Sequence, residues 1–407
     1  MIRIQESQEV TGSIAQRDSR LAEAIAVVAP MLDDIRKRGD AAVFDYARKF
    51  DQFAGSSFRV AAAASLSPAL AEAIEIAAAN IRDYARCQVP QSRMVEHADG
   101  RKLGQIVRPL DSAGVYIPAG RFPLISTLLM TAIPAQAAGV ERIVVACPNP
   151  VAEILGTARY LQLPEVWQIG GAQAIGAMAF GTETIPKVDL IAGPGNIYVA
   201  AAKKLVAGEV KIDFVAGPTE IVIIAAEGNP KWIAADMLAQ AEHDVDASSI
   251  LLTTSRSLAE AVAQEIDKQL ETLPTAAIAR VSIEKNGLIV LVDSMEHAME
   301  ISNQLAPEHL SLHDPSLLAG IKHAGSVFLG AWSTEAAGDY ASGPNHVLPT
   351  SGAARMYGGL SAADFVKVIS VQELSREALA KLASAITTLA RAEGLEAHAR
   401  SVEARND

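Results

Sequence analysis

Short apolar runs and longer helical runs alternate through the middle of the chain. Each apolar run is rich in β-branched residues and has the length of a buried strand; these runs occupy residues 114–118, 142–148, 166–171 and 188–193. The runs with helical spacing follow them at residues 126–139, 151–163, 172–180 and 196–208. Strands that alternate with helices over short connections form a parallel sheet covered on both faces, so we predict a parallel α/β domain here.

The same alternation begins again after residue 219. We predict further strands at residues 220–227, 248–255 and 288–293. Helices are predicted at 229–243 and 257–273, and the first of them begins with Asn229 as its N-cap and Pro230 at its first position. The predicted fold class is therefore α/β, with two tandem Rossmann-like domains built on incomplete parallel sheets.

The two ends of the chain differ in pattern from the middle. Residues 1–60 and 66–86 carry charges with helical periodicity, and residues 361–407 do so again. We therefore predict small helical extensions at the N- and C-termini. The C-terminal extension is too short to form a domain alone, so we expect it to pack against something else, such as a partner chain.

Composition and charge narrow the classes of function. The 407 residues are half apolar and one-fifth charged, which is typical of a globular protein with two or three domains. The net charge of −12 argues against binding to nucleic-acid backbones or anionic membrane surfaces. Cys87 and Cys147 form no disulfide framework, and no apolar run has the length of a signal peptide or membrane helix. The expected location is a reducing cytoplasm.

Two polar residues close the helix predicted at 229–243. The sequence LAQAEHDVD places Gln240 and His243 three residues apart, so their side chains share one helix face. Such a pair can converge on a metal ion, as Glu-x-x-His pairs do. The alternative is a solvated helix end, which the spacing alone favours because glutamine is an uncommon metal ligand.

Two further motifs combine acids with histidines. In LAPEHLSLH, Pro307 disfavours helix, so Glu308 and His309 are expected at a turn that enters an extended run. They either act as general acid and base or form a surface pair. In GDYASGPNHVLPT, Asp339 and His346 lie on a loop framed by glycine and proline after an apparent strand, where α/β proteins form ligand sites.

Two glycine-rich turns, at 170–176 and 192–196, each follow a predicted strand and open a predicted helix. Their backbone N–H groups can approach a phosphate or carboxylate, but neither turn is a G-x-G-x-x-G fingerprint. Asn196 is equally well explained as a helix cap. In the tail, the pattern around Glu393 and His398 by itself indicates only solvated charge.

Taken together, these motifs resemble one family. Blocks of the histidinol dehydrogenases are matched, in order and spacing, by GVYIPAG, PLISTLLMTAIPAQAAGV, GGAQAIGAMAFGTETIPKVDLIAGPGN, DFVAGPTEI, LAQAEHD, APEHLSL and GSVFLG followed by AGDYASGPNHVLPT. The resemblance runs from about Ala26 to His398. Three departures are visible: Thr219 replaces the family's serine, Asp244 replaces its glycine, and residues 354–365 are less rich in serine.

The resemblance implies a role for each candidate residue. It implies one zinc ion per subunit, held by Gln240, His243, Asp339 and, from the partner subunit, His398. It assigns the acid–base chemistry to Glu308 and His309. NAD contacts are implied for Tyr116, Gln173 and Asn196. Substrate contacts are implied for Thr219, Gln240, His243, His309, Asp339, His346, Glu393 and His398.

The resemblance also implies a reaction and an organisation. The reaction is the NAD-dependent oxidation of L-histidinol through L-histidinaldehyde to L-histidine, the last steps of histidine biosynthesis, by a cytoplasmic homodimer. The implied parts are an N-terminal extension, a first α/β domain with most of the zinc and catalytic site, a second α/β domain that binds NAD, and a helical tail that reaches the partner subunit. Their respective bounds are 1–15, 16–115 with 221–360, 116–220 and 361–407.

Other classes of protein remain open on the sequence alone. A related zinc- and NAD-dependent enzyme could act on another alcohol, such as a sulfonated diol. Glu393 argues against an anionic substrate, whereas Thr219 keeps that alternative open. A zinc hydrolase would use Glu308 as the base for a zinc-bound water, and NAD binding would distinguish it from a dehydrogenase. A non-catalytic binding protein is disfavoured because every polar position of the site is retained.

Overall fold

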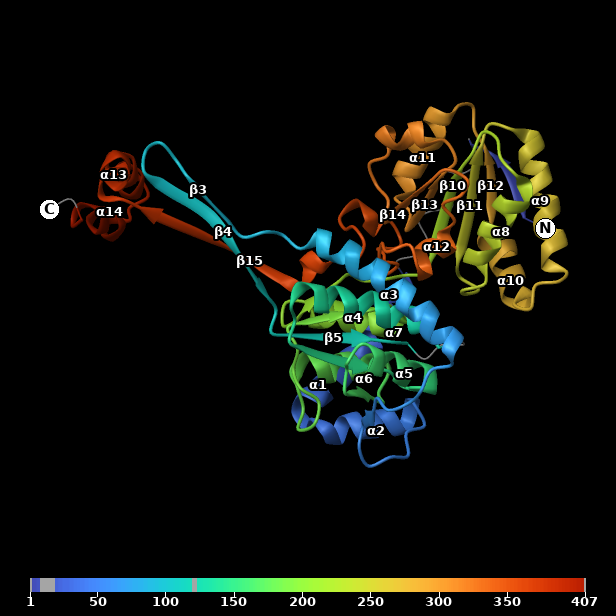
Figure 1. Cartoon of the computed structure of the whole chain (residues 1–407), viewed down its shortest axis with the longest axis horizontal. Helices are drawn as coiled ribbons and strands as arrows, with labels where there is room; N and C mark the ends of the chain where they lie inside the picture. The colour runs from blue at the N-terminus through green and yellow to red at the C-terminus, as the bar shows by residue number, and fades with distance from the viewer. Residues whose placement is uncertain (1, 8–18, 119–122, 406–407) are drawn as a thin grey trace. The chain divides into compact units, whose positions relative to one another are not determined.

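The computed structural model describes residues 2–7, 19–118 and 123–405 (Figure 1). The chain divides into two compact units. The larger contains the residues up to Gln88 together with Asp111–Phe365, and the smaller contains Val89–Leu110 and the residues from Val366 onward. Two six-stranded sheets lie in the larger unit, and nearly all of their neighbouring strands run parallel. The predicted α/β class with two parallel sheets is confirmed.

One of these sheets has the strand order β2-β7-β6-β5-β8-β9. Its strands are β2 (Arg59–Ala61), β5 (Ser112–Tyr116), β6 (Arg142–Ala146), β7 (Glu165–Trp167), β8 (Leu190–Ala192) and β9 (Lys211–Ile212). Only β2 pairs antiparallel, with β7. Every residue of β5 and β8 is buried, as expected for strands that helices cover on both faces.

The helices around this sheet come from a longer part of the chain than we expected. They are α1 (Ser19–Arg38), α2 (Asp40–Phe50), α3 (Pro68–Gln88), α4 (Ile125–Ala138), α5 (Ala152–Tyr160), α6 (Gly171–Phe180) and α7 (Ile197–Val206). The expected division placed residues 16–115 in the other α/β domain. Instead, α1 packs against α6 and α7, α2 packs against α6, and β2 and β5 are strands of this sheet.

The division differs from the expected one because the apolar face of α1 packs against helices of the sheet that contains β5. Its apolar face, which includes Val28 and Leu32, shares one core with Ile175 of α6 and Val199 of α7. Periodicity identifies which face of a helix is buried, but it does not identify the sheet that covers that face. The N-terminal helices could therefore be predicted as helices without being assigned to the correct sheet.

The other sheet is parallel throughout, with the order β1-β12-β11-β10-β13-β14. Its strands are β1 (Arg3–Glu6), β10 (Glu220–Ile224), β11 (Ser248–Thr253), β12 (Leu288–Leu291), β13 (His309–Leu312) and β14 (Ser326–Leu329). The strand β1 was not predicted, because residues 1–60 were expected to be helical. Its first and last residues are exposed and its middle two are partly buried, and they pair with β12 from far along the chain.

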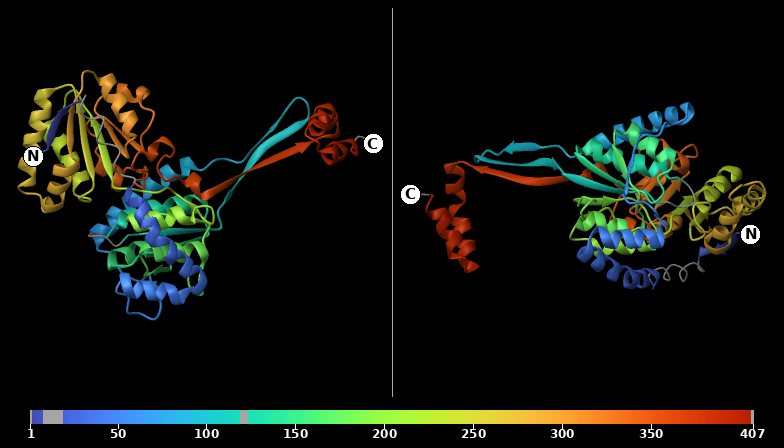
Figure 2. Two further views of the ribbon diagram at one scale, coloured as in Figure 1. Left: turned by 180° about the vertical axis from the view of Figure 1, so that it is seen from behind. Right: turned by 90° about the horizontal axis from the view of Figure 1, so that it is seen from below.

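Helices cover both faces of this second sheet (Figure 1 and Figure 2). They are α8 (Pro230–Ala241), α9 (Arg256–Leu270), α10 (Ala276–Asn286) and α11 (Met295–Leu305). Successive residues of β10 alternate between two cores: Ile221 and Ile223 pack with α8, α9 and α10, whereas Val222 and Ile224 pack with α11. The continuous apolar run of β10 thus reflects burial on both faces.

The helix α8 determines where the polar motifs meet. As predicted, Asn229 caps it through a side chain that accepts from the Lys231 N–H, and Pro230 is its first residue. The helix ends at Ala241, so Gln240 lies in its last turn and His243 lies in the turn beyond it. In a parallel sheet, such a helix returns the chain to the amino-terminal edge of the next strand.

Shorter elements complete the larger unit. They are α12 (Glu335–Tyr340) and the 3₁₀ helices η2 (Pro315–Gly320), η3 (Ala353–Arg355) and η4 (Ala362–Phe365). None of the helices in the described parts of the chain combines the length and the apolar character that crossing a membrane requires.

The smaller unit is built around a three-stranded antiparallel sheet with the order β15-β4-β3. Its elements are β3 (Arg93–Glu96), β4 (Arg101–Pro109), β15 (Val366–Leu374), α13 (Arg376–Ala392) and α14 (Glu396–Glu403). In both views of Figure 2 the three strands run side by side, and α13 follows β15. The tail that was expected to be helical therefore contains a nine-residue strand. Its partner β4 comes from a distant part of the chain, so local periodicity gave no sign of the pairing.

Candidate active site

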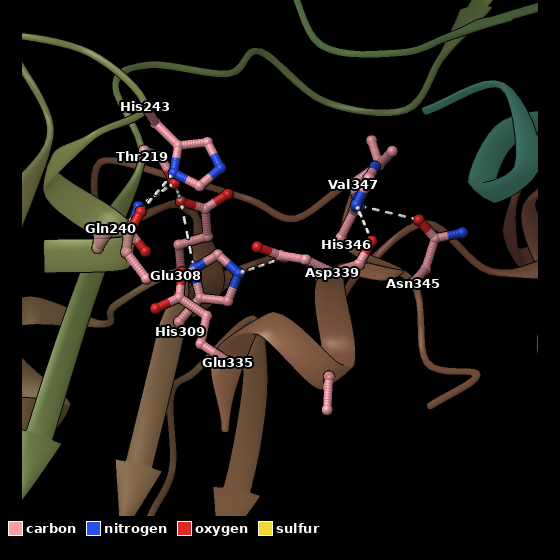
Figure 3. A network of polar contacts seen from close by, with 12 residues as sticks. Thr219, Gln240, His243, Glu308, His309, Glu335, Asp339, Asn345, His346 and Val347 are labelled. Atoms are coloured by element: carbon pink, nitrogen blue, oxygen red, sulfur yellow. Dashed lines mark hydrogen bonds and ion pairs between the residues drawn. The ribbon is translucent and has the colours of Figure 1, made fainter. Parts of the chain in front are cut away.

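A cluster of polar side chains lies at the amino-terminal edge of the second sheet. Glu220 and His309 are the first residues of the neighbouring strands β10 and β13, which pair with Ile221 opposite His309. Thr219 and Glu308 immediately precede the same two strands. Strand pairing therefore brings two separate sequence motifs side by side. In Figure 3, the strands lead away from this cluster.

Glu308 is a buried carboxyl group with polar partners on both sides. Its Oε2 accepts from the Glu220 N–H at 2.9 Å and from the Thr219 hydroxyl at 2.5 Å. Burial raises the pKa of Glu308 to about 7, although the neighbouring His309 and these hydrogen bonds oppose the rise. A carboxyl group with a pKa near neutrality can both give and take a proton, so the alternative of a surface Glu-His pair does not apply.

His309 is also buried, and its two ring nitrogens have different surroundings. Its Nδ1 lies 3.2 Å from the Glu220 carbonyl oxygen, which can only accept, so Nδ1 carries a proton. Its Nε2 is buried, has no hydrogen-bond partner among the described residues, and lies 3.6 Å from the Asp339 carboxylate. Nε2 is thus the nitrogen that is available to a ligand.

Carboxylates surround the His309 ring. Burial alone would lower the pKa of this imidazole, but the charges of Glu335, Glu308 and Asp339 outweigh burial and raise that pKa to about 10. Glu335 and Glu308 each approach Nδ1 to 3.6 Å. The cluster is therefore strongly acidic, and it favours a positive charge at its centre.

Asp339 and His346 are connected through the backbone. His346 Nδ1 lies 2.8 Å from the Asp339 carbonyl oxygen. Burial would raise the pKa of the Asp339 carboxyl group, but the imidazoles of His309, His346 and His243 lower it below its usual range. Burial lowers the pKa of His346 in turn, so this imidazole is neutral at pH 7. We expected residues 338–350 to be a loop, whereas Asp339 belongs to α12.

The three histidines share one hydrogen-bonding pattern. In each, Nδ1 lies within hydrogen-bonding distance of a backbone carbonyl oxygen: His243 with Ala239 at 3.0 Å, His309 with Glu220 at 3.2 Å and His346 with Asp339 at 2.8 Å. Because a carbonyl oxygen only accepts, each Nδ1 carries a proton. In its neutral form, an imidazole with the proton on Nδ1 presents the lone pair of Nε2 to a metal ion, a substrate or a proton.

Gln240 is fully buried between Thr219 and Glu335. Its amide must present nitrogen to the Glu335 carboxylate, because an amide oxygen there would face two other acceptors. In this orientation the amide nitrogen donates to Glu335 Oε2 at 3.2 Å and also to Oε1, and the carbonyl oxygen lies 2.5 Å from the Thr219 hydroxyl, whose single proton goes either to this oxygen or to Glu308 Oε2. The alternative of a solvated helix end therefore does not describe Gln240, although His243 is exposed.

The residues expected to bind the cofactor lie at the other sheet, where strands end. Tyr116 is the last residue of β5, and its hydroxyl oxygen accepts from the Gly171 N–H at 3.0 Å. Gln173 is buried and donates to Asp51 at 2.9 Å. The same carboxylate of Asp51 accepts from the Gly170 N–H at 3.1 Å.

The glycine turn before α7 is held firmly on both sides. A buried ion pair joins Lys203 and Asp213; Lys203 donates to the Gly193 carbonyl oxygen and Asp213 accepts from the Gly193 N–H. Gly193 has φ of +125°, and a Cβ there would lie 2.2 Å from the Tyr116 carbonyl oxygen, so only glycine fits. Asn196 caps α7 through a side chain that accepts from two N–H groups. Its role as a cofactor contact stays a prediction.

Comparisons with known proteins now identify the family. The histidinol dehydrogenase family model matches residues 14–406. A histidinol dehydrogenase of Bacillus licheniformis is 47% identical over 404 residues, which cover 96% of this chain and 95% of that protein. The crystal structure of a histidinol dehydrogenase from Elizabethkingia anophelis matches with a TM-score of 0.89 and 38% identity, covering 99% of this chain and 97% of that one. This chain belongs to the histidinol dehydrogenase family.

Of the metal, catalytic and substrate residues that the family resemblance implied, seven lie in the cluster at the amino-terminal edge: Thr219, Gln240, His243, Glu308, His309, Asp339 and His346 (Figure 3). Two do not. Glu393 follows α13 and His398 lies in α14; both are exposed and belong to the smaller compact unit. Their roles stay predictions.

Two buried or partly buried acids were missed by the sequence reasoning. Glu335 lies four residues before Asp339 on α12, a spacing that places both on one helix face and that could have indicated it. Asp51 follows the end of α2, and its hydrogen-bond partners are more than a hundred residues away, so no local pattern indicated it. Burial raises the pKa of Asp51.

Two sets of possible metal ligands share Asp339. Ligand atoms of His309, Glu335 and Asp339 lie within 4.8 Å of one another, which suits a metal ion geometrically. The family resemblance instead implies Gln240, His243 and Asp339 together with His398. The second set suits the chemistry of this family better, because it leaves His309 Nε2 free to act as a base. It stays a prediction.

Proposed function

We propose that this chain is an NAD-dependent, zinc-containing histidinol dehydrogenase that oxidises L-histidinol through L-histidinaldehyde to L-histidine. The observation that carries the proposal is the pairing of His309 and Glu308: a buried imidazole with an unpartnered Nε2 beside a buried carboxyl group whose pKa is about 7. Membership of the family supplies the substrate and the cofactor. No second function is favoured by a specific contact.

Zinc fits the residues around Asp339. The Asp339 carboxyl group has a lowered pKa and is therefore charged, and His243 has Nδ1 on a carbonyl oxygen, which leaves Nε2 for the metal. Gln240 would contribute its carbonyl oxygen, and His398 of the partner subunit would complete the set. When bound, zinc would hold and orient the amine and imidazole nitrogens of histidinol.

The first oxidation requires a base at the hydroxyl group of the substrate. His309 Nε2 takes the hydroxyl proton while hydride leaves the same carbon for the nicotinamide of NAD⁺, and the products are the aldehyde and NADH. His309 starts with a raised pKa because carboxylates surround it. Asp339 would bind the metal, so its carboxylate would no longer hold a proton on His309, and Nε2 could then accept the proton of the substrate.

The second oxidation requires water. The Glu308 carboxylate takes one proton from a water molecule, whose oxygen adds to the aldehyde carbon to give the hydrate after protonation of the carbonyl oxygen. His309 then takes a hydroxyl proton of the hydrate while hydride leaves for a second NAD⁺. One histidinol, one water and two NAD⁺ thus give histidine, two NADH and three protons. Thr219 and His346 would contact the substrate, and Glu393 would hold its imidazole ring.

The proposed assembly is a homodimer in which the smaller unit of one subunit completes the site of the other. The support is that Glu393 and His398 are exposed in a unit separate from the cluster, although the family resemblance implies that both contact the site. Mixed dimers test this directly. A His309→Asn subunit combined with a His398→Asn subunit should regain activity, because one of the two sites then has both histidines intact. If the mixture stays inactive while mixed dimers are present, the shared site is wrong.

The overall function is tested by counting NADH. Metal-replete protein is mixed with limiting L-histidinol and excess NAD⁺ at mildly alkaline pH. Two NADH per histidinol, lost on chelation and restored by zinc, are expected. No NADH from histidinol, in protein that still holds zinc, would refute the proposed substrate and would direct attention to Thr219.

A further inference from the structure

Glu335 is a buried carboxyl group to which the proposed mechanism assigns no role. Only 3% of its surface is exposed, and it is the first residue of α12. The preceding Thr334 caps that helix through a side chain that accepts from the Ala337 N–H. The capped helix therefore fixes Glu335 and, one turn later, Asp339 on the same face.

The Glu335 carboxylate lies between two residues of the proposed machinery. It accepts from the Gln240 amide nitrogen at 3.2 Å through Oε2, and at a shorter distance through Oε1. The same Oε1 lies 3.6 Å from His309 Nδ1. One buried carboxylate thus contacts both a proposed metal ligand and the proposed base.

The hydrogen bond from Gln240 to Glu335 determines the orientation of the Gln240 amide group. A glutamine side chain binds metals through its carbonyl oxygen, and that oxygen has two lone pairs. With the amide nitrogen held by Glu335, the oxygen points away from the carboxylate. That oxygen faces the Thr219 hydroxyl, and because it has two lone pairs, one remains available to a metal even when Thr219 donates to the other. Without Glu335, the amide could rotate and present nitrogen, which cannot bind a cation.

We propose that Glu335 is a positioning residue that holds the Gln240 carbonyl oxygen toward the metal and steadies the His309 ring through Nδ1. The proposal rests on the proposed function, since it takes Gln240 as a metal ligand. Residues that orient metal ligands by hydrogen bonds commonly contribute about 10–100-fold in metal affinity. The rival explanation is that Glu335 is itself a ligand, together with His309 and Asp339.

The test measures zinc affinity by competition with a chelator, in four proteins: the unsubstituted chain, Glu335→Ala, Gln240→Ala and the double variant. If Glu335 acts through Gln240, the Glu335→Ala variant binds zinc about 10–100-fold more weakly than the unsubstituted chain. The double variant then binds zinc little more weakly than Gln240→Ala alone. If Glu335 binds zinc directly, the loss is equally large in both backgrounds, and the proposal is wrong. Should Glu335→Ala fail to fold, Glu335→Asp replaces it, because its carboxylate is withdrawn by one methylene group.

A conservative variant provides the second criterion. Glu335→Gln keeps an oxygen that can accept from Gln240 but cannot ionise, so its zinc affinity should lie within about threefold of the unsubstituted chain, because the orienting hydrogen bond persists. A loss as large as that of Glu335→Ala would overturn the positioning role. NADH production by the unsubstituted chain is measured alongside. Its failure would count against the proposed function, whereas the zinc measurements decide the role of Glu335 independently.

Discussion

The two parallel sheets present their candidate site residues at opposite edges. In the sheet that contains β5, the residues follow strands: Tyr116 ends β5, and the glycine turns come after β7 and β8. In the sheet that contains β10, they precede strands: Thr219 comes before β10, and Glu308 before β13. Ligands of open α/β sheets usually bind at the carboxyl ends of the strands, so the first sheet follows the rule and the second does not.

Helix polarity gives this difference a physical meaning. At the carboxyl edge of a parallel sheet, helices begin, and their N-termini favour anions such as the phosphates of a dinucleotide. At the amino edge, helices end, and their C-termini favour cations. The end of α8 carries Gln240 and His243 to that edge, where the Asp339 carboxylate, whose pKa is lowered, adds negative charge beside the buried carboxyl groups of Glu308 and Glu335. One edge is thus suited to an anionic cofactor and the other to a metal ion.

The largest predicted effect contrasts the two ends of β13. His309 begins this strand, and His313 follows its last residue, so the two histidines lie at opposite edges of one sheet. His309→Asn should lower kcat by about 10²–10⁴-fold, because the base is lost. His313→Asn, the matched control, should leave kcat within about twofold. Steady-state kinetics of both variants check this. Equal losses of kcat would contradict the prediction that only the amino-terminal edge of this sheet takes part in catalysis.

The next effect separates the two oxidations. Glu308→Gln should leave the first hydride transfer nearly intact and slow the second by about 10²–10⁴-fold, because only the second needs activated water. With limiting histidinol, the NADH yield should fall from two toward one per substrate, and an aldehyde trap should capture the product. An unchanged ratio of two would show that Glu308 does not activate the water.

A smaller effect is expected at the carboxyl edge of the other sheet. Asp51→Ala removes the acceptor for the Gly170 N–H and the Gln173 amide, which leaves two buried donors without a partner. The KM for NAD⁺ should rise by about tenfold, equivalent to about 1.4 kcal/mol, with little change in kcat. Asp45 is exposed on α2, the helix that precedes Asp51, and Asp45→Asn serves as the control. A fall in kcat with an unchanged KM would contradict a cofactor site at this edge.

The smallest effect concerns the stability of the acidic edge. Burial raises the pKa of Asp236, on α8, to about 6. A carboxyl group with a raised pKa in the folded state stabilises the fold below its ordinary pKa near 4, and this stabilisation is lost as the pH rises through 6. Asp236→Asn should therefore stabilise the metal-free protein at pH 8, by about 1–3 kcal/mol, and have little effect at pH 4. Thermal unfolding at both pH values measures this; a pH-independent difference would argue against a buried charge.

Much of the larger unit could be predicted because its signals are local. Continuous apolar runs such as β10 are buried on both faces, and helix signals such as Asn229 and Pro230 lie beside the elements they begin. The strands β1, β3, β4 and β15 were missed for the opposite reason. β1 and β3 have four residues each, β3 and β15 are largely exposed and β4 is only partly buried, so none of them has the apolar run of a buried strand. β1, β4 and β15 also pair with strands far away in the sequence, and that pairing leaves no local pattern.

The candidate site shows the same limit. Motif spacing raised His309, Gln240 and Asp339 as candidates, and only the family resemblance gave them roles. Strand pairing is needed to place the APEHL motif beside Thr219, and the tertiary structure is needed to bring Glu335 to Gln240. We expected the N-terminal helices to pack on the sheet that contains β10, whereas they pack on the sheet that contains β5. The amphipathic pattern of a helix shows which face is buried but not which sheet that face packs against. Residues 8–15 of the expected N-terminal extension lie outside the described residues.

The pairing of β4 with β15 has a consequence for the synthesis of the chain. The hairpin of β3 and β4 leaves the ribosome about 250 residues before β15, which at roughly 5–20 residues per second is a delay of about 12–50 s. During that interval one long edge of β4 has no partner, and exposed strand edges invite pairing with other chains. During this period, the β4 strands of nascent chains on the same messenger RNA could pair with one another. A chaperone that binds this hairpin would be most useful then.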